Sequence, residues 1–177
     1  MQRITQLISV LLHPLFMPLY ATWILLNSGS YLSFAVSPPM KTVIYMIVLI
    51  TTYILPAISS WFLYQKGVIK SLEMDTRAER SLPLFSAIIS YIAGLYLLIK
   101  LPLPKIFAVM LSGGLIVLVA AFLINLRWKI SLHMLGIGGL LGLLLGFSEI
   151  FHSDVLLPVI ITALVSGLLA SVRLWRN

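Results

Sequence analysis

Four cations in two parts of the chain have the chemistry of an anion-binding site. The segment Gln65–Ser81 contains Lys70 and Arg77, with six residues between them, and Arg80 one helical turn further on. Arg173 lies near the other end of the sequence. Lysine and arginine each offer several N–H donors, which suits the oxygens of a phosphate group. These four side chains are therefore candidates for phosphate binding.

A serine and a histidine two positions apart supply further groups that phosphoryl transfer needs. Ser131 can donate a hydroxyl hydrogen bond, and His133 can exchange a proton near neutral pH. Phosphoryl transfer depends mostly on positioning and charge stabilisation, together with a nucleophile and an acid for the leaving group. These residues favour an anion site at a membrane surface. No metal or other cofactor is predicted, because the carboxylates and the three histidines do not form a ligand set.

Hydrophobic helices must position these residues. The chain is 60% apolar and only 10% charged, whereas a soluble domain has roughly 25% charged residues. A membrane helix needs about 20 mostly apolar residues. Six segments meet or nearly meet this requirement: Leu7–Leu26, Thr42–Tyr64, Leu82–Ile99, Ile106–Leu126, Ile130–Phe147 and Val155–Val172. We therefore predict an all-α, polytopic transmembrane bundle of about six helices, a single integral membrane domain over residues 1–177, and we exclude a soluble globular domain.

The alternation of helices assigns the connectors to sides of the membrane. The N-terminus, the segment Gln65–Ser81, the turn Arg127–Lys129 and the C-terminus share one side, which carries nine of the twelve Lys and Arg residues. All the candidate site residues fall there. Positive charge favours the cytoplasmic side, but several of these cations belong to the candidate site, so the orientation stays open. The net charge of +7 indicates anionic lipid headgroups or an anionic substrate as partners; the cations form no basic face for nucleic acid.

At three places the sequence resembles the type-2 phosphatidic acid phosphatase superfamily, whose motifs are K-x6-R-P, P-S-G-H and S-R-x5-H-x3-D. Lys70 and Arg77 match the first motif, with Ala78 in place of its proline. Ile130-Ser131-Leu132-His133 matches the second at its serine and histidine. Ser171-Val172-Arg173 is similar to the start of the third, with one residue inserted.

A subgroup of bacterial membrane proteins in that superfamily is similar over more of the chain. The shared stretches are the early His-Pro-Leu at 13–15, the Leu-Glu-Met-Asp at 72–75 and the Lys-Ile-Ser-x-His-Met at 129–134. The resemblance therefore covers most of the chain. It implies a multi-pass protein of the bacterial inner membrane.

The resemblance implies hydrolysis of a lipid phosphate or prenyl diphosphate through a phospho-histidine, without a metal. Lys70, Arg77 and Arg173 would hold the phosphate, Ser131 would bond one of its oxygens, and His133 would protonate the leaving alkoxide. The family's nucleophile is the histidine of the third motif, which would fall just beyond Asn177. We expect the chain as given to bind phosphate and to turn over poorly or not at all.

Structural interpretations of the same residues remain open. The cations of the segment Gln65–Ser81 could pair with its carboxylates, at about 0.2–0.5 kcal/mol for each pair at helical spacing. Ser131 could cap a helix, and Asn125 could form a hydrogen bond across the bundle. The protein would then be a non-catalytic membrane protein, either a lipid-phosphate-binding remnant or a small transporter component.

Two further patterns predict helix geometry. Gly138, Gly142 and Gly146 form a GxxxGxxxG stripe, which predicts close packing against a neighbouring helix. His13, with Pro14 and Pro18, predicts a kink in the first helix.

Overall fold

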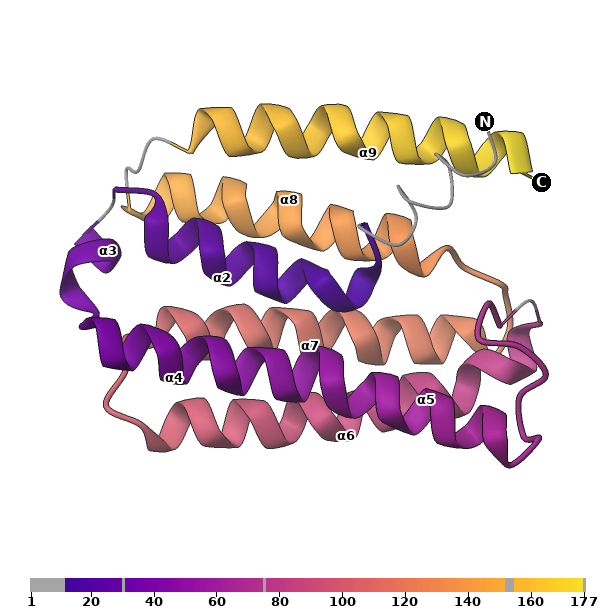
Figure 1. Ribbon diagram of the computed structural model, residues 1–177. Coiled ribbons are helices and arrows are strands. Elements are labelled where there is room, and N and C mark those ends of the chain that lie inside the picture. The colour runs from indigo at the N-terminus through magenta and orange to yellow at the C-terminus, as the bar shows by residue number, and fades with distance from the viewer. Residues whose placement is uncertain (1–11, 30, 75, 152–154, 177) are drawn as a thin grey trace. The chain divides into compact units, whose positions relative to one another are not determined.

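Every element in the described part of the chain is helical (Figure 1). The computed structural model describes residues 12–29, 31–74, 76–151 and 155–176, without the side chains of Tyr31, Leu169 and residues 172–176. The elements are η1 (Pro14–Phe16), α2 (Met17–Asn27), α3 (Tyr31–Ala35), α4 (Pro38–Val48), η2 (Leu49–Ile54), α5 (Leu55–Gln65), α6 (Arg77–Lys100), α7 (Ile106–Asn125), α8 (Leu132–Phe151) and α9 (Leu156–Arg176). The predicted all-α class is confirmed.

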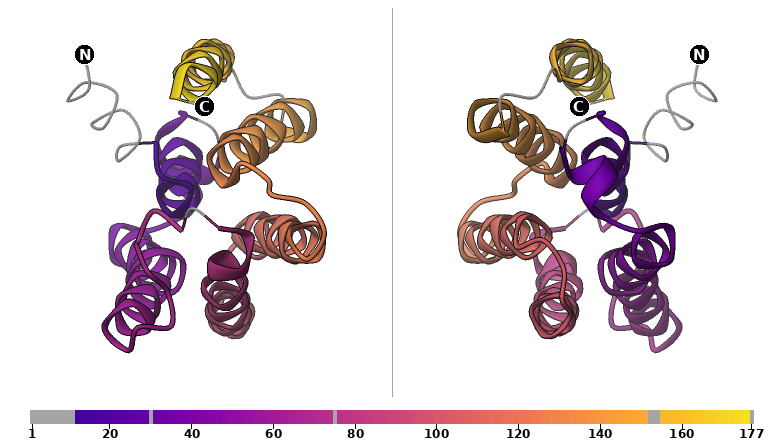
Figure 2. Two further views of the ribbon diagram at one scale, coloured as in Figure 1. Left: turned by 90° about the vertical axis from the view of Figure 1, so that its right-hand side faces the viewer. Right: turned by 90° about the vertical axis from the view of Figure 1, so that its left-hand side faces the viewer.

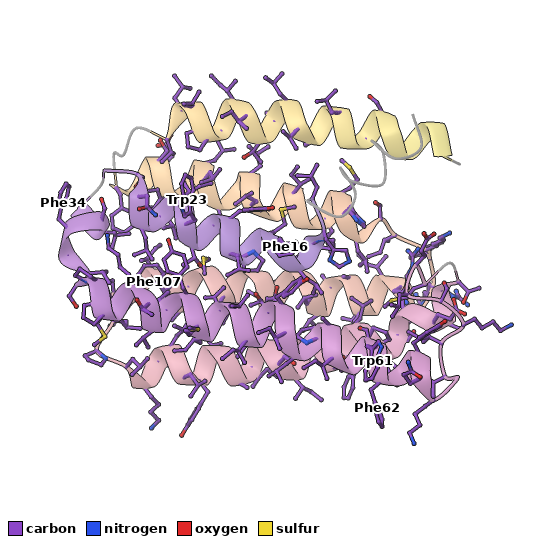
Figure 3. All side chains as sticks on the ribbon, in the orientation of Figure 1. Phe16, Trp23, Phe34, Trp61, Phe62 and Phe107 are labelled. Atoms are coloured by element: carbon purple, nitrogen blue, oxygen red, sulfur yellow. The ribbon has the colours of Figure 1, made fainter. Side chains whose placement is uncertain are left out.

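The chain is a membrane protein by the length and composition of its helices. Four helical stretches are long and apolar enough to cross a membrane: Pro38–Gln65, Arg77–Lys100, Ile106–Asn125 and Leu132–Phe151. A shorter apolar stretch, Leu156–Leu168, belongs to α9. Large apolar side chains are exposed along the long helices, as Trp61 and Phe62 of α5 are at 54% each (Figure 3). Such a surface suits contact with lipid.

Contacts divide the chain into two compact units, each with one central helix. In the unit 42–130, α6 packs against α7 on one side and against η2 and α5 on the other. In the unit formed by residues 1–41 and 131–177, α8 packs against α9 and against α2. Figure 2 shows α9 beside α8 end on.

The helix from Pro38 to Gln65 contains a π-helical segment, η2, before Pro56. A proline inside a helix removes one N–H donor, and its ring clashes with the carbonyl four residues earlier. The wider turn accommodates this, and the N–H of Leu55 accordingly bonds to the carbonyl of Ile50, five residues back. The hydroxyls of Thr51 and Thr52 donate to carbonyls four residues earlier, at 2.7 and 2.8 Å.

α6 approaches η2 closely at Gly94. A Cβ added to Gly94 would lie 2.9 Å from Cβ of Thr51 and 3.1 Å from Cδ2 of Leu111 on α7. A separation below 3.0 Å from a neighbouring Cβ requires the backbone to move. Gly94 therefore sets the distance between the central helix of this unit and its neighbours.

α6 begins at Arg77, earlier than the predicted Leu82, because a capping box starts it. The hydroxyl of Thr76 accepts from the N–H of Glu79 at 3.4 Å, and the carboxylate of Glu79 accepts from the N–H of Thr76 at 3.3 Å. This reciprocal pair satisfies two N–H groups that a helix start leaves free. Arg77 and Arg80 are thus helical residues rather than connector residues.

Ser131 lies immediately before α8, at the N-cap position that the structural interpretation gave it. Its carbonyl accepts from the N–H of Leu135 at 3.1 Å, immediately before the helix begins at Leu132.

The predicted first helix, Leu7–Leu26, is interrupted in its described part, and residues 7–11 lie outside the described residues. His13 is extended (φ −62°, ψ 135°), and helical structure starts at Pro14. A residue before proline disfavours the helical conformation, while proline suits the first turn of a helix. Among the described residues this point is a helix start, and the predicted kink, which also involves residues 7–11 outside them, stays a prediction.

The described residues show no close packing at the glycine stripe of α8. A Cβ added at Gly138, Gly142 or Gly146 would meet no described atom within 4 Å. Spacing alone does not show which glycine faces a neighbour.

We predict that Gly94→Ala lowers the free energy of unfolding by about 1–3 kcal/mol, because it overpacks the contact with Thr51. Thermal unfolding in detergent, followed by tryptophan fluorescence, measures this. Gly113→Ala is the control, since a Cβ there would meet no described atom within 4 Å. Equal melting temperatures for the two variants would contradict the prediction.

Candidate functional site

Two of the candidate arginines bind backbone carbonyls at one end of the unit 42–130. Nη1 of Arg77 donates to the carbonyl of Arg127 at 2.7 Å. Arg80 donates from Nη1 to the carbonyl of Ile130 at 2.7 Å and from Nε to the carbonyl of Met74 at 2.8 Å. Carbonyls that follow a helix lack helical donors. Both arginines therefore connect the start of α6 to the chain that follows α7.

Asn125 reinforces the same junction from within the core. It is fully buried at the end of α7, and its Nδ2 donates to the carbonyl of Arg77 at 2.9 Å and to the hydroxyl of Ser81 at 3.4 Å. The predicted hydrogen bond between helices is confirmed. Its Oδ1 is buried without a hydrogen-bond partner among the described atoms.

Lys70 belongs to the same end of this unit. Its backbone N–H donates to Oε1 of Glu79 at 3.2 Å, so the carboxylate that caps α6 also holds the connector. The side chain of Lys70 is exposed. The structure thus brings Lys70, Arg77 and Arg80 to one end of one unit. The carboxylate of Glu79 bonds backbone N–H groups. The structural interpretation of the sequence had proposed only that it pairs with cationic side chains.

Ser131 and His133 belong to the other unit. Ser131 is exposed, and His133 is half-buried in the first turn of α8. The ring of His133 lies against that of His13, with centroids 5.4 Å apart and planes at 78°. The sequence assigned His13 no catalytic or binding role, and no spacing rule relates residues so far apart in the chain. The one feature of the sequence that could have drawn attention to His13 was its place beside two prolines in an apolar segment.

Gly136 allows the histidines to approach. A Cβ on Gly136 would lie 3.0 Å from Cβ of Pro14 and 3.2 Å from Cγ of Met17. The first turn of α8 therefore packs directly on η1 and the start of α2. The glycine that matters for His133 is this one, outside the predicted stripe.

An apolar cavity of about 450 Å³ runs between α2, α8 and α9 within the same unit. Leu12, which precedes His13 in the chain, and Ile137, one turn after His133, both line it, whereas neither histidine does. Residues four apart share a face of a helix, so His133 and Ile137 lie on one face of α8. Trp23 also lines the cavity. In Figure 3 it lies well along α2 from the end of that helix near Phe16. The lining comprises Leu12, Met17, Tyr20, Trp23, Ile24, Asn27, Ser28, Ile137, Leu140, Leu157, Pro158, Ile161, Thr162 and Val165.

Arg173 belongs to α9, and its side chain lies outside the described residues. Ser171, the other residue of the third-motif match, donates its hydroxyl to the carbonyl of Gly167 at 3.0 Å. The described residues contain no group of three His, Cys, Asp or Glu side chains that could hold a metal. Comparisons with protein-family models, curated proteins and solved structures find no match to this chain.

We predict that Asn125→Ala lowers the free energy of unfolding by about 1–3 kcal/mol, because it removes two hydrogen bonds that contribute about 0.5–1.5 kcal/mol each. Thermal unfolding in detergent measures the change. The matched control is Ser112→Ala on the same helix, which removes only a bond to the carbonyl of Ala108 four residues earlier. A melting temperature for Asn125→Ala equal to that of the control would contradict a structural role for this bond.

Proposed function

We propose that this chain is a membrane phosphatase that resembles the type-2 phosphatidic acid phosphatases. It has about six membrane spans in the bacterial inner membrane and hydrolyses a lipid phosphate or prenyl diphosphate at the membrane surface. The observation that carries the proposal is that His133 lies one helical turn before Ile137, which lines the apolar cavity, on the same face of α8. A titratable side chain beside a hydrocarbon-lined space suits a substrate with a phosphate head and an apolar tail.

The roles follow the motif matches. Lys70, Arg77 and Arg173 hold the phosphate, and Ser131 donates a hydrogen bond to one of its oxygens. Arg80 joins them as a further cation. A guanidinium has five N–H donors in a fixed fork. The bond from Arg77 to the carbonyl of Arg127 uses one of them, so the others are left for phosphate oxygens.

His133 acts as the acid in this proposal. It gives a proton to the alkoxide or phosphate oxygen that leaves when the bond to phosphorus breaks. In the family that the chain resembles, the nucleophile that attacks phosphorus is the histidine of the third motif, which is not among residues 1–177. The phospho-histidine then reacts with water, which releases inorganic phosphate and restores the free histidine.

A non-catalytic membrane protein is the second candidate, and one observation favours it. The guanidinium groups of Arg77 and Arg80 both bind backbone carbonyls. Arginines that only stabilise a helix junction would have the same bonds. Measured turnover separates the two candidates.

We predict that protein expressed from its native reading frame releases inorganic phosphate in detergent from at least one of phosphatidate, phosphatidylglycerol phosphate and prenyl diphosphates. His133→Ala should remove most of that release, since it removes the acid; general acid–base catalysis contributes roughly 100- to 10,000-fold. His133→Asn, a polar replacement of similar shape, provides a second test should the alanine variant fold poorly. A folded variant with full activity would refute the role of His133.

The matched pair for the phosphate site is Lys70→Ala and Lys100→Ala. Both lysines are exposed. Lys100 lies at the C-terminal end of α6, with its Nζ 5.5 Å from the ring centroid of Tyr96. We expect Lys70→Ala to raise KM or lower kcat, and Lys100→Ala to match the unmodified protein. No phosphate release from any substrate, by monodisperse protein that carries the third-motif histidine, would favour the non-catalytic candidate.

A further inference from the structure

We propose that His13 is a positioning residue for His133. Contact with the ring of His13 holds the ring of His133, the proposed acid, in one orientation. The inference rests on the proposed function and adds a residue to its site. The ring contact at 5.4 Å and 78° carries it. A near-perpendicular arrangement is one that aromatic rings prefer, because the positive edge of one ring meets the negative face of the other.

The ring of His13 is itself fixed by a hydrogen bond. Its Nδ1 accepts from the N–H of Leu15 at 3.3 Å, which caps the helical turn η1. A nitrogen that accepts carries no proton, so a neutral His13 has its hydrogen on Nε2. The cap thus sets both the ring orientation and the tautomer of His13.

The backbone that carries His13 is also constrained. Pro14 has its φ angle locked by its own ring, and Gly136 lets Pro14 lie directly on the first turn of α8. His13 therefore presents a rigid surface to His133. Both histidines belong to one compact unit of the fold.

An acid must direct one particular nitrogen toward the leaving oxygen. An imidazole that is free to turn over would present either nitrogen and would spend less time in the reactive orientation. The contact with His13 restricts that motion. Because positioning governs much of the rate of phosphoryl transfer, loss of the contact should lower kcat more than it raises KM.

The test compares two substitutions that separate the functions of the His13 side chain. His13→Asn retains an acceptor near the position of Nδ1 and so keeps the cap, but it removes the ring. His13→Phe keeps the ring and loses both nitrogens. We expect kcat to fall by up to about 100-fold in His13→Asn, the scale of a misplaced reacting group. We expect His13→Phe to lose less activity although the cap is gone, because Pro14 and Gly136 still hold the backbone so that a ring meets His133. Full activity in His13→Asn, or equal losses in both variants, would overturn the proposal.

Gly136→Ala provides a second route that leaves both histidines in place. Its Cβ would press on Pro14 and displace His13 from His133, so kcat should again fall. Gly138→Ala on the same helix is the control, since a Cβ there would meet no described atom within 4 Å. Equal kcat values in these two variants would count against the proposal.

A readout that does not need turnover separates this inference from the proposed function. Nuclear magnetic resonance of the imidazole signals in detergent, assigned with His133→Asn, reports the surroundings of the His133 ring. We expect those signals to shift in His13→Asn and much less in His13→Phe. No shift in either variant would overturn the contact, whereas shifts without phosphate release from any substrate would overturn the phosphatase and leave the contact standing.

Discussion

The structure depends on how an apolar chain satisfies the backbone groups where its helices end. Inside hydrocarbon, helices satisfy their own backbone, but the last carbonyls of each helix have no helical donor. The junction of α6 and α7 meets this need with side chains, since Arg77 and Arg80 bind carbonyls beyond α7 and Asn125 binds a carbonyl of α6. Without these bonds, the carbonyls of Arg127, Ile130 and Arg77 would lose the side-chain donors that the structure gives them.

The same bonds constrain any phosphate site built from these cations. An arginine that already binds a carbonyl has a fixed position, so a phosphate meets donors that need little ordering. Such an arginine also has fewer N–H donors left for an anion. Arg80 already donates from both Nε and Nη1 to carbonyls. Arg77 is exposed and donates from Nη1 to the carbonyl of Arg127. The two arginines thus differ in what they can offer an anion, although charge and spacing make them look alike in the sequence.

The helical class and the positions of the long helices were predictable, because apolar run length is a strong signal when the solvent is hydrocarbon. The predicted start of α6 at Leu82 is the point where the apolar run begins. The capping box of Thr76 and Glu79 starts the helix at Arg77 instead. Glycine contacts were missed for another reason. Whether Gly94, Gly136 or Gly138 faces a neighbour depends on how helices are rotated against each other, and one helix's own sequence does not encode that. The pairing of His13 with His133 depends on the same packing.

In the proposed phosphatase, the surroundings of His133 indicate where discrimination between substrates would arise. Lipid tails are as apolar as leucine side chains, so a tail gains little free energy by moving from the bilayer into the cavity between α2, α8 and α9. The cavity can therefore admit a tail without selecting strongly for its structure. Selection would then rest on the head group and on polar side chains held firmly near it. His133 meets that condition because Gly136, Pro14 and His13 fix the turn on which it lies.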